Sequence, residues 1–234
     1  SHFRPVSHYF RQNFSQVTNP PIDSLRENKV MSLKTRFGNL GNILDFDNLT
    51  EEDIYVLDSP ILTNSQFSKF CKIFSKKIKI VDCTFEINTS LKDRIELIKI
   101  ECETAVREGS STLILSDKNI SNKRASIPSV LSVGAVHSHL VKNSLRGYCS
   151  LNVECADTLD THSFAVLIGV GATTINPYLA IDSIYQRYEK KLFGNFEYED
   201  CIKRYIKSVN SGLLKIMSKM GISVLSSYRG GCNF

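Results

Sequence analysis

Two histidines, His137 and His139, are the residues whose type and spacing most readily suggest chemistry. Imidazoles are common ligands of zinc and other transition metals. The surrounding pattern predicts a helix, on which side chains two positions apart point about 200° away from each other. The two rings therefore cannot hold one ion together, and a structural or surface role is the stronger interpretation. His162 has no sequence neighbour that would complete a Ser–His–Asp or Cys–His set.

A glycine-containing loop, Gly169 to Ala172, is the second candidate. It is predicted to follow an apolar strand and precede a helix, which is where backbone N–H groups can hold a phosphate. The third glycine of the dinucleotide fingerprint is missing, and close packing of a strand on a helix explains the loop equally well. Binding of a flavin or a dinucleotide here stays open as the alternative function, that of a self-contained oxidoreductase.

The C-terminal run from Ser227 to Gly231 places Arg229 among flexible residues after an expected strand. Such a run could hold a carboxylate or a phosphate, although a turn that leads into a further helix is the simpler interpretation. The acidic run 51–53 is typical of the charged first turn of a short helix, and no acid/base partner accompanies it. No hydrolase site can be assembled from these groups.

The cysteines form no metal or cluster motif. There are seven, no two in a CxxC pair: Cys71, Cys83, Cys102, Cys149, Cys155, Cys201 and Cys232. The nearest pair is six positions apart, and most cysteines fall within apolar segments. Free, partly buried thiols in a reducing cytoplasm are expected.

The elements that must position these residues alternate between strands and helices. Strands are predicted at 54–57, 77–81, 112–115, 148–154 and 222–225, and the run 164–170 is apolar without interruption. Helices are predicted to begin at Asn64, Ser90, Pro128 and Asn176, and a last one over 198–220 has a possible break at Ser211 and Gly212. The clearest helix places Leu91, Ile95, Ile98, Cys102 and Ala105 on one face and ends at Gly109. A polar loop is expected at 117–126. The fold class is therefore α/β, a mainly parallel sheet with flanking helices that is either open or shaped like an incomplete barrel.

The first 44 residues lack this periodicity and form an irregular arm ahead of an α/β core over residues 45–234. Asn19 precedes two prolines, which favour an extended chain without N–H donors. Polar and charged side chains are concentrated here, and we expect them to bind groups outside the core: Arg11, Gln12, Gln16, Asn19, Asp23, Arg26 and Glu27.

Bulk properties restrict the function classes. Lys and Arg total 29 against 24 Asp and Glu, an excess that is spread along the sequence. A nucleic-acid partner is therefore not expected. No apolar run approaches the roughly 20 residues that cross a bilayer, and no signal pattern opens the chain, so neither a membrane partner nor secretion is expected.

The chain resembles the central domain of glutamate synthase large chains. The resemblance is carried, in order, by FRQNFSQVTNPPIDSLRE, VMSLKTRFGN, LDSPIL, IPSVLSVGAVHSHLV, HSFAVLIGVGATTINPYLA and YIKSVNSGLLKIMSKMGISVLSSYRGG. It spans residues 9–231, with small departures at Ser138, where the family often has a third histidine, and at Cys232, where glutamine is familiar.

The resemblance implies one central domain over residues 1–234 of an FMN and iron–sulfur enzyme. That enzyme converts L-glutamine, 2-oxoglutarate and electrons from NADPH or ferredoxin into two L-glutamates. The expected partners are the glutaminase and FMN-binding domains of the same polypeptide, with a small NADPH-oxidising subunit as a further partner. The family's catalytic residues have no matching positions here, so no catalytic, cofactor-binding or metal-binding residue is expected in this chain. The arm is expected at the junction of the catalytic domains, close to the route of ammonia.

Overall fold

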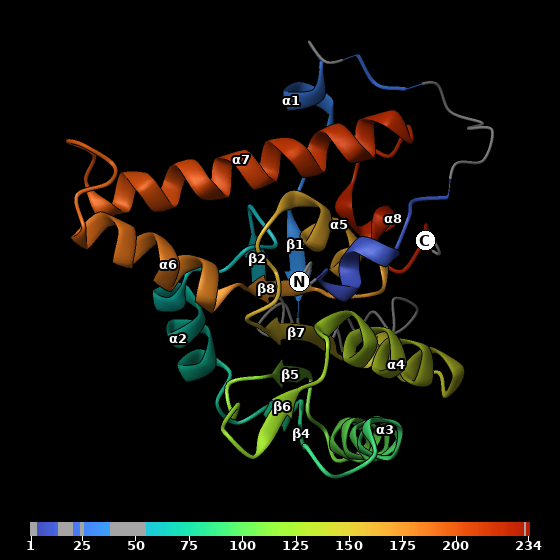
Figure 1. Ribbon diagram of the computed structural model, residues 1–234. Coiled ribbons are helices and arrows are strands. Elements are labelled where there is room, and N and C mark those ends of the chain that lie inside the picture. The colour runs from blue at the N-terminus through green and yellow to red at the C-terminus, as the bar shows by residue number, and fades with distance from the viewer. Residues whose placement is uncertain (1–3, 14–20, 24–25, 38–54, 232) are drawn as a thin grey trace.

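A four-stranded parallel sheet lies at the centre of the computed structural model, which describes residues 4–13, 21–23, 26–37, 55–231 and 233–234 (Figure 1). Its strands, in order across the sheet, are β3 (Ile78–Asp82), β5 (Thr112–Ser116), β7 (Ser150–Glu154) and β8 (Thr174–Asn176). Spatial order follows chain order, and the described strands do not close into a barrel. The predicted open α/β architecture is confirmed.

Three helices connect successive strands: α3 (Leu91–Arg107), α4 (Ser129–Lys142) and α5 (Thr161–Gly169). Since parallel strands that follow one another are joined by right-handed crossovers, these helices cover the same face of the sheet. α3 packs on α4, and α4 packs on α5. The opposite face is covered by α2 (Asn64–Ile73), whose Phe67 and Phe70 pack with Ile114 of β5.

The later helices extend this core. α6 (Tyr178–Glu189) follows β8, and α7 (Tyr198–Lys219) packs against both α5 and α6, as Figure 1 shows. A short helix, α8 (Leu225–Tyr228), comes next. No helix in the described part of the chain is long and apolar enough to span a membrane.

Burial explains why strands β5 and β7 could be predicted from their apolar sequences. Every residue of β5 and of β7 is buried, as expected for strands whose two faces are both covered. Leu113 and Leu115 belong to the large cluster formed with α3, α4 and α5, while Ile114 points to the α2 side. Val81 of β3 joins the large cluster as well.

The start of α3 follows the prediction, and the start of α2 is shifted by one residue. The Ser90 side chain accepts a hydrogen bond from Asp93 N (3.2 Å), and Gly109 adopts φ 98° beyond the end of α3. The cap of α2 is Thr63 instead of Asn64. Its side chain accepts from Gln66 N while Gln66 accepts from Thr63 N, which is a complete capping box.

Three predictions of strands and loops were wrong. The apolar run 164–170 lies within helix α5 and its C-cap, and every residue from Ser163 to Gly169 is buried. The loop 117–126 contains β6 (Arg124–Ser126), which pairs antiparallel with β4 (Thr84–Glu86). Residues 222–225 form no strand; Val224 makes a single bridge to Ser32 before α8 begins.

Three helix predictions also differ from the structure. Asn176, predicted to start a helix, is the last residue of β8, and the helix from Pro128 is predicted to run to about Arg146. α4 ends at Lys142, since Ser144 takes a positive φ of 58°, and a separate 3-10 turn, η4 (Arg146–Tyr148), precedes β7. α7 is unbroken through Gly212. The glycine is explained by packing, since a Cβ there would lie 2.5 Å from Thr161 Cγ2. Gly212 therefore allows α7 to approach α5 closely and does not interrupt the helix.

The N-terminal arm is more regular than predicted. It contains a 3-10 turn η1 (Val6–Tyr9), the short α1 (Glu27–Val30) and β1 (Thr35–Phe37). β1 pairs antiparallel with β2 (Tyr55–Leu57), so the arm returns to the body as part of a two-stranded sheet.

Candidate interdomain surface

The arm is attached to the body through its backbone. Ile22 N donates to Ser218 O (3.0 Å), at the end of α7. Ser32 N donates to Ser223 O (2.8 Å), and Leu225 N donates to Ser32 O (3.1 Å). These bonds fix the course of the arm over α7 and α8 and leave its side chains available for other contacts.

Apolar anchors support the same path. Met31 and Leu33 are buried in the main core, and Val6, Phe10 and Ile22 pack against it. The arm lacks a periodic apolar pattern, yet these few apolar side chains are enough to attach it to the core. Met31 and Leu33 are two residues apart, a spacing typical of an extended segment with one face inward.

The candidate site residues divide into two groups. Gln12 Nε2 contacts Met220 Sδ, and Glu27 Oε1 accepts a hydrogen bond from Ser218 Oγ (2.8 Å), so these two side chains bind the body. Arg11, Asp23 and Arg26 are exposed. Gln16 and Asn19 lie outside the described residues, as does the acidic run 51–53.

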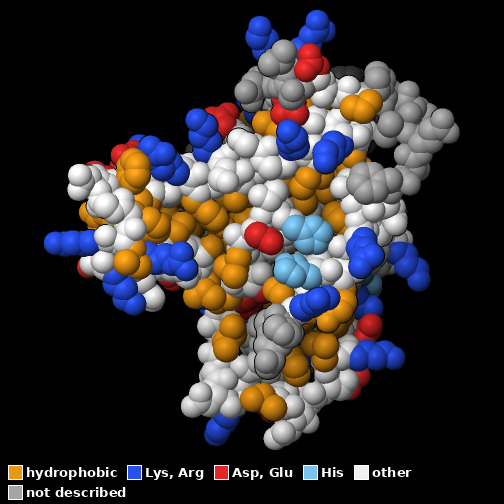
Figure 2. All heavy atoms as spheres, turned by 45° about the horizontal axis from the view of Figure 1, so that its top comes forward, with side chains coloured by type: hydrophobic (Ala, Val, Ile, Leu, Met, Phe, Trp, Pro, Cys, Tyr) orange, Lys and Arg blue, Asp and Glu red, His pale blue; other side chains and the backbone are white. Residues whose placement is uncertain are grey.

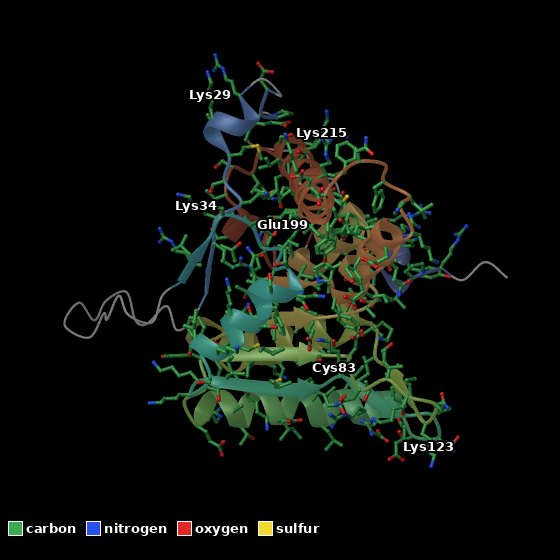
Figure 3. The ribbon with its side chains drawn as sticks, turned by 90° about the vertical axis from the view of Figure 1, so that its left-hand side faces the viewer. Lys29, Lys34, Cys83, Lys123, Glu199 and Lys215 are labelled. Atoms are coloured by element: carbon green, nitrogen blue, oxygen red, sulfur yellow. The ribbon has the colours of Figure 1, made fainter. Side chains whose placement is uncertain are left out.

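The outer face of this region carries mixed chemistry. Figure 2 shows hydrophobic side chains interspersed with Lys and Arg on the face turned to the viewer, with histidine side chains near its centre. His8 and His162 rings are 6.1 Å apart, and His162 Nε2 lies 2.9 Å from Ser7 O. Figure 3 shows Lys29 and Lys34 projecting outward from the arm. Such a mixture of apolar and charged groups is usual at interfaces between domains.

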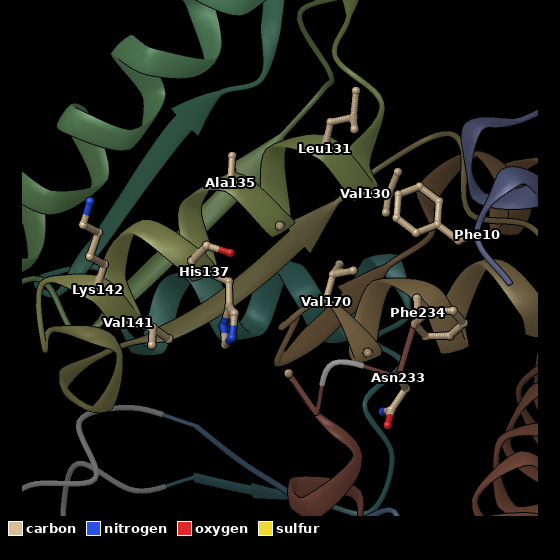
Figure 4. A pocket seen from close by; sticks show the side chains of 14 residues that line it. Phe10, Val130, Leu131, Ala135, His137, Val141, Lys142, Val170, Asn233 and Phe234 are labelled. Carbon is tan, nitrogen blue, oxygen red and sulfur yellow. The ribbon is translucent and has the colours of Figure 1, made fainter. Parts of the chain in front are cut away.

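A groove of about 650 Å³ opens beside the arm, between α4, the end of α5 and the C-terminal residues (Figure 4). Its lining is mainly apolar, with His137, Ser138, Lys142 and Asn233 as polar members, and the apolar side chains come from Phe10, Val130, Leu131, Ala135, Val141, Val170 and Phe234. No carboxylate lines the groove, and His137 Nδ1 is bonded to Arg146 Nε instead of to the neighbouring Ser138 hydroxyl.

The two candidate histidines point to different partners, as their spacing predicted. His139 Nε2 lies 2.6 Å from Glu103 Oε2, which joins α4 to α3. His137 Nδ1 accepts a hydrogen bond from Arg146 Nε (3.1 Å), on the other side of α4. No group of three or more possible metal ligands occurs among the described residues.

Arg146 was not identified in the sequence, yet its side chain binds four residues. Besides His137, its guanidinium donates to Cys149 O (2.6 Å), Gly171 O (2.9 Å) and Thr173 Oγ1 (3.2 Å). Arg229 donates from Nε to Ala172 O (3.0 Å) close by. Burial, reinforced by Arg146, lowers the pKa of Arg229 to about 10. Arg229, which could have held a carboxylate or a phosphate, instead makes a structural contact that holds loop 169–172.

Burial, together with Arg146 and Arg229, also lowers the pKa of His137 to about 4. The folded state then binds fewer protons than the unfolded state between about pH 6.5 and pH 4, so stability should fall as the pH decreases through this window. We expect a loss of about 1 to 2 kcal/mol after allowance for the half-buried ring.

His137→Asn keeps an acceptor for Arg146 without a titrating ring, so it should lose less stability than the wild type between pH 6.5 and pH 4.5. Denaturant unfolding at both pH values measures the difference. Equal acid sensitivity in the two proteins would contradict the contribution of His137.

The glycine loop has the opposite setting from the one predicted. It follows helix α5 and precedes strand β8, so no helix N-terminus points toward it. A Cβ at Gly169 would lie 2.4 Å from the Phe234 ring, and one at Gly171 would lie 2.3 Å from His137. Side chains of the protein itself occupy the space beside both glycines. The loop does not fit the phosphate of FMN or of a dinucleotide, and the alternative based on it loses its support.

Ligands in open α/β sheets usually bind at the carboxyl ends of the strands. Here that edge is filled by the protein's own side chains. Asp117 accepts from Tyr178 Oη (2.9 Å) and from Ala156 N (2.9 Å), while Glu154 accepts from Ser116 Oγ (2.6 Å) and pairs with Lys118 (2.7 Å). Burial raises the pKa of Asp117. The network contains residue types that are common in active sites, but its polar groups form hydrogen bonds and an ion pair with one another.

The six described cysteines are free thiols, and all except Cys71 are buried. Burial raises the pKa of Cys83, Cys102, Cys149 and Cys155, which disfavours the thiolate form that iron–sulfur clusters and zinc require. Cys232 lies outside the described residues. The described cysteines therefore do not fit a cluster site.

Comparison with known proteins relates this surface to a family. The family model described as "Glutamate synthase central domain" matches residues 1–234. Among curated proteins, the chain is 53% identical to the glutamate synthase [NADPH] large chain of Azospirillum brasilense, over 99% of this chain and 15% of that protein. It is 41% identical to the chloroplastic ferredoxin-dependent glutamate synthase of Spinacia oleracea, over 95% of this chain and 15% of that protein. It is 40% identical to the glutamate synthase [NADPH] large chain of Bacillus subtilis, over 95% of this chain and 14% of that protein. The chain thus spans about 15% of the length of these relatives.

Proposed function

The chain belongs to the glutamate synthase central-domain family, and on that premise we propose that it is the connecting domain of a glutamate synthase. In this role it packs the glutaminase domain against the FMN-binding synthase domain and helps to shape the route of ammonia between them. The complete enzyme converts L-glutamine and 2-oxoglutarate, with a reductant, into two L-glutamates.

The observation that supports this role is the construction of the arm. Backbone bonds to Ser218 and Ser223 hold it on the body, while the side chains of Arg11 and Arg26 are exposed. Polar groups that a domain needs for its own stability are usually buried and paired within it. Exposed groups on a well-anchored segment are instead available to a neighbouring domain, and Gln16 and Asn19 belong to the same proposed contact.

The apolar groove supports the same conclusion. It adjoins the arm through Phe10 and offers Val130, Leu131 and Val170 as contact area. A neighbouring domain that covered both the groove and the arm would combine an apolar centre with a polar rim, which is the usual anatomy of a stable interface.

The complete enzyme requires FMN and an iron–sulfur cluster for the reduction that forms glutamate. The described residues of this chain fit neither group, so we assign both to other domains. Relatives are named as NADPH-dependent and as ferredoxin-dependent, and both reductants agree with the proposal. A small NADPH-oxidising subunit would be a partner only in the first case. The buried free thiols agree with a reducing compartment, and a cytoplasmic location remains part of the proposal.

Arg26→Ala and Arg11→Ala in the full-length enzyme test the interdomain role. Both side chains are exposed, so we expect the free energy of unfolding to change by less than about 0.5 kcal/mol. We expect glutamine hydrolysis to exceed glutamate formation, because ammonia escapes at a loosened junction. Asn19→Ala should behave in the same way.

The measurement is the ratio of glutamine hydrolysed to 2-oxoglutarate consumed, with Lys123→Ala as the control. Lys123 is exposed near the β4–β6 pair, far from the arm in Figure 3, and its variant should keep a one-to-one ratio. If the arm variants keep that ratio while their stability falls, the arm is a structural element and the proposal is wrong.

A further inference from the structure

One edge of the parallel sheet is uncovered in the described structure. β3 is the outermost strand, next to β5 only. At the opposite edge, Ile175 N donates to Pro60 O (2.8 Å) and Leu62 N donates to Ile175 O (2.9 Å), so β8 is covered. Open strand edges are ready templates for pairing with another extended segment.

The direction of the backbone groups in β3 follows from the bonds at its two ends. Lys77 O accepts from Thr112 N (3.1 Å), and Cys83 N donates to Ser116 O (2.8 Å). In a parallel pair, alternate residues direct both backbone groups to the same neighbour. The backbone groups of residues 77, 79, 81 and 83 therefore bond to β5. The backbone N–H and C=O groups of Ile78, Ile80 and Asp82 point away from β5, toward the open edge.

Of these three residues, Asp82 is the one whose outward backbone group is bonded to a described side chain. Asp82 O accepts a hydrogen bond from Arg94 Nη2 (2.5 Å). Among the described residues, no strand lies beside Ile78 or Ile80 on this edge. The Ile80 side chain is 57% exposed and Ile73, at the end of α2, is equally exposed, so the edge is apolar as well as open.

The surroundings of this edge are strongly basic. Residues 69–79 contain five lysines and no acidic residue, namely Lys69, Lys72, Lys76, Lys77 and Lys79. Lys79 Nζ lies 3.2 Å from Glu101 Oε1 of α3. The positive charge is therefore more concentrated than the overall sequence balance indicated.

On the basis of the proposed function, we infer that the β3 edge binds an extended acidic segment from the part of the full-length synthase polypeptide that lies outside these 234 residues. The relatives are about seven times longer than the matched region, since it covers 15% of them, so candidate segments are plentiful. The segment would add a strand beside Ile78 and Ile80, with its carboxylates near Lys72 and Lys76. A second copy of β3 is a poor occupant, because pairing would bring the two lysine clusters together.

Hydrogen exchange on the full-length protein, with fragmentation that resolves single amides, tests this inference. If the segment pairs, the amides of Ile78 and Ile80 exchange at least about tenfold more slowly than unprotected amides. In Lys72→Glu/Lys76→Glu, this protection should be lost. The matched control Lys92→Glu/Lys123→Glu makes the same charge change at exposed sites elsewhere and should keep it.

Zero-length carbodiimide crosslinking of the same protein identifies the occupant. A link from Lys72 or Lys76 to an Asp or Glu outside the 234 residues is the expected result. The inference is overturned if both amides exchange without protection in the wild type, or if charge reversal leaves protection unchanged. It is also overturned if the links lead to residues 38–54 of this chain or to a second copy.

Discussion

Gly171→Ala should lower the free energy of unfolding by about 2 to 5 kcal/mol. Gly171 adopts φ 123°, a backbone conformation that costs L-residues about 1 to 2 kcal/mol. The added Cβ would also lie 2.3 Å from the His137 ring, and displacing that ring breaks its bond to Arg146 (3.1 Å). Overpacking of this kind typically costs a further 1 to 3 kcal/mol or so.

Gly134→Ala is the matched control for this substitution. Gly134 lies inside α4, and its added Cβ would meet only Val170 Cβ at 3.9 Å, an ordinary contact. Since alanine favours helix more than glycine does, this variant should be more stable than the wild type by about 0.5 to 1 kcal/mol. Denaturant unfolding of both variants measures the contrast, and a Gly171→Ala protein as stable as the wild type would contradict the packing described around His137.

Ile98→Ala should destabilise the protein by about 2 to 4 kcal/mol, through lost apolar contacts and the cavity left behind. Ile98 is fully buried on the inner face of α3, within the main core. Ile100, two residues further along the same helix, is 59% exposed.

Ile100→Ala removes the same atoms from the same helix, so it controls for helix propensity. Its change in free energy of unfolding should stay within about 0.5 kcal/mol. The expected result is therefore a large difference between two chemically identical substitutions, measured by thermal or denaturant unfolding. Similar midpoints for the two variants would show that α3 does not present Ile98 to the core.

Of three buried elements, α3 and β5 could be predicted from the sequence and α5 could not. α3 carries a periodic apolar face and begins at Ser90, whose side chain caps it, and it was predicted correctly. β5 was recognised because both its faces are covered. α5 is buried on all sides, so its apolar run has no helical period and was taken for a strand.

Other features depend on contacts that no local pattern contains. β4 and β6 have three residues each, and they pair across a distance of 40 positions in the sequence. Arg146 joins His137, Cys149, Gly171 and Thr173 through a geometry that exists only after folding. The arm is held by backbone hydrogen bonds, which leave no mark on residue type, and by apolar side chains that follow no regular spacing. For this reason its polar side chains could be selected as candidates, but the path between them could not be predicted.

The direct test of whether this chain connects catalytic domains without an active site of its own is a binding measurement on the purified chain. FMN and NADPH are titrated into the 234-residue protein by calorimetry, and its visible absorption spectrum is recorded before any addition. We predict no flavin absorption and no saturable binding of either compound, because Phe234 and His137 occupy the space beside Gly169 and Gly171. A yellow protein with stoichiometric flavin, or tight binding of NADPH, would contradict the account and restore the oxidoreductase alternative.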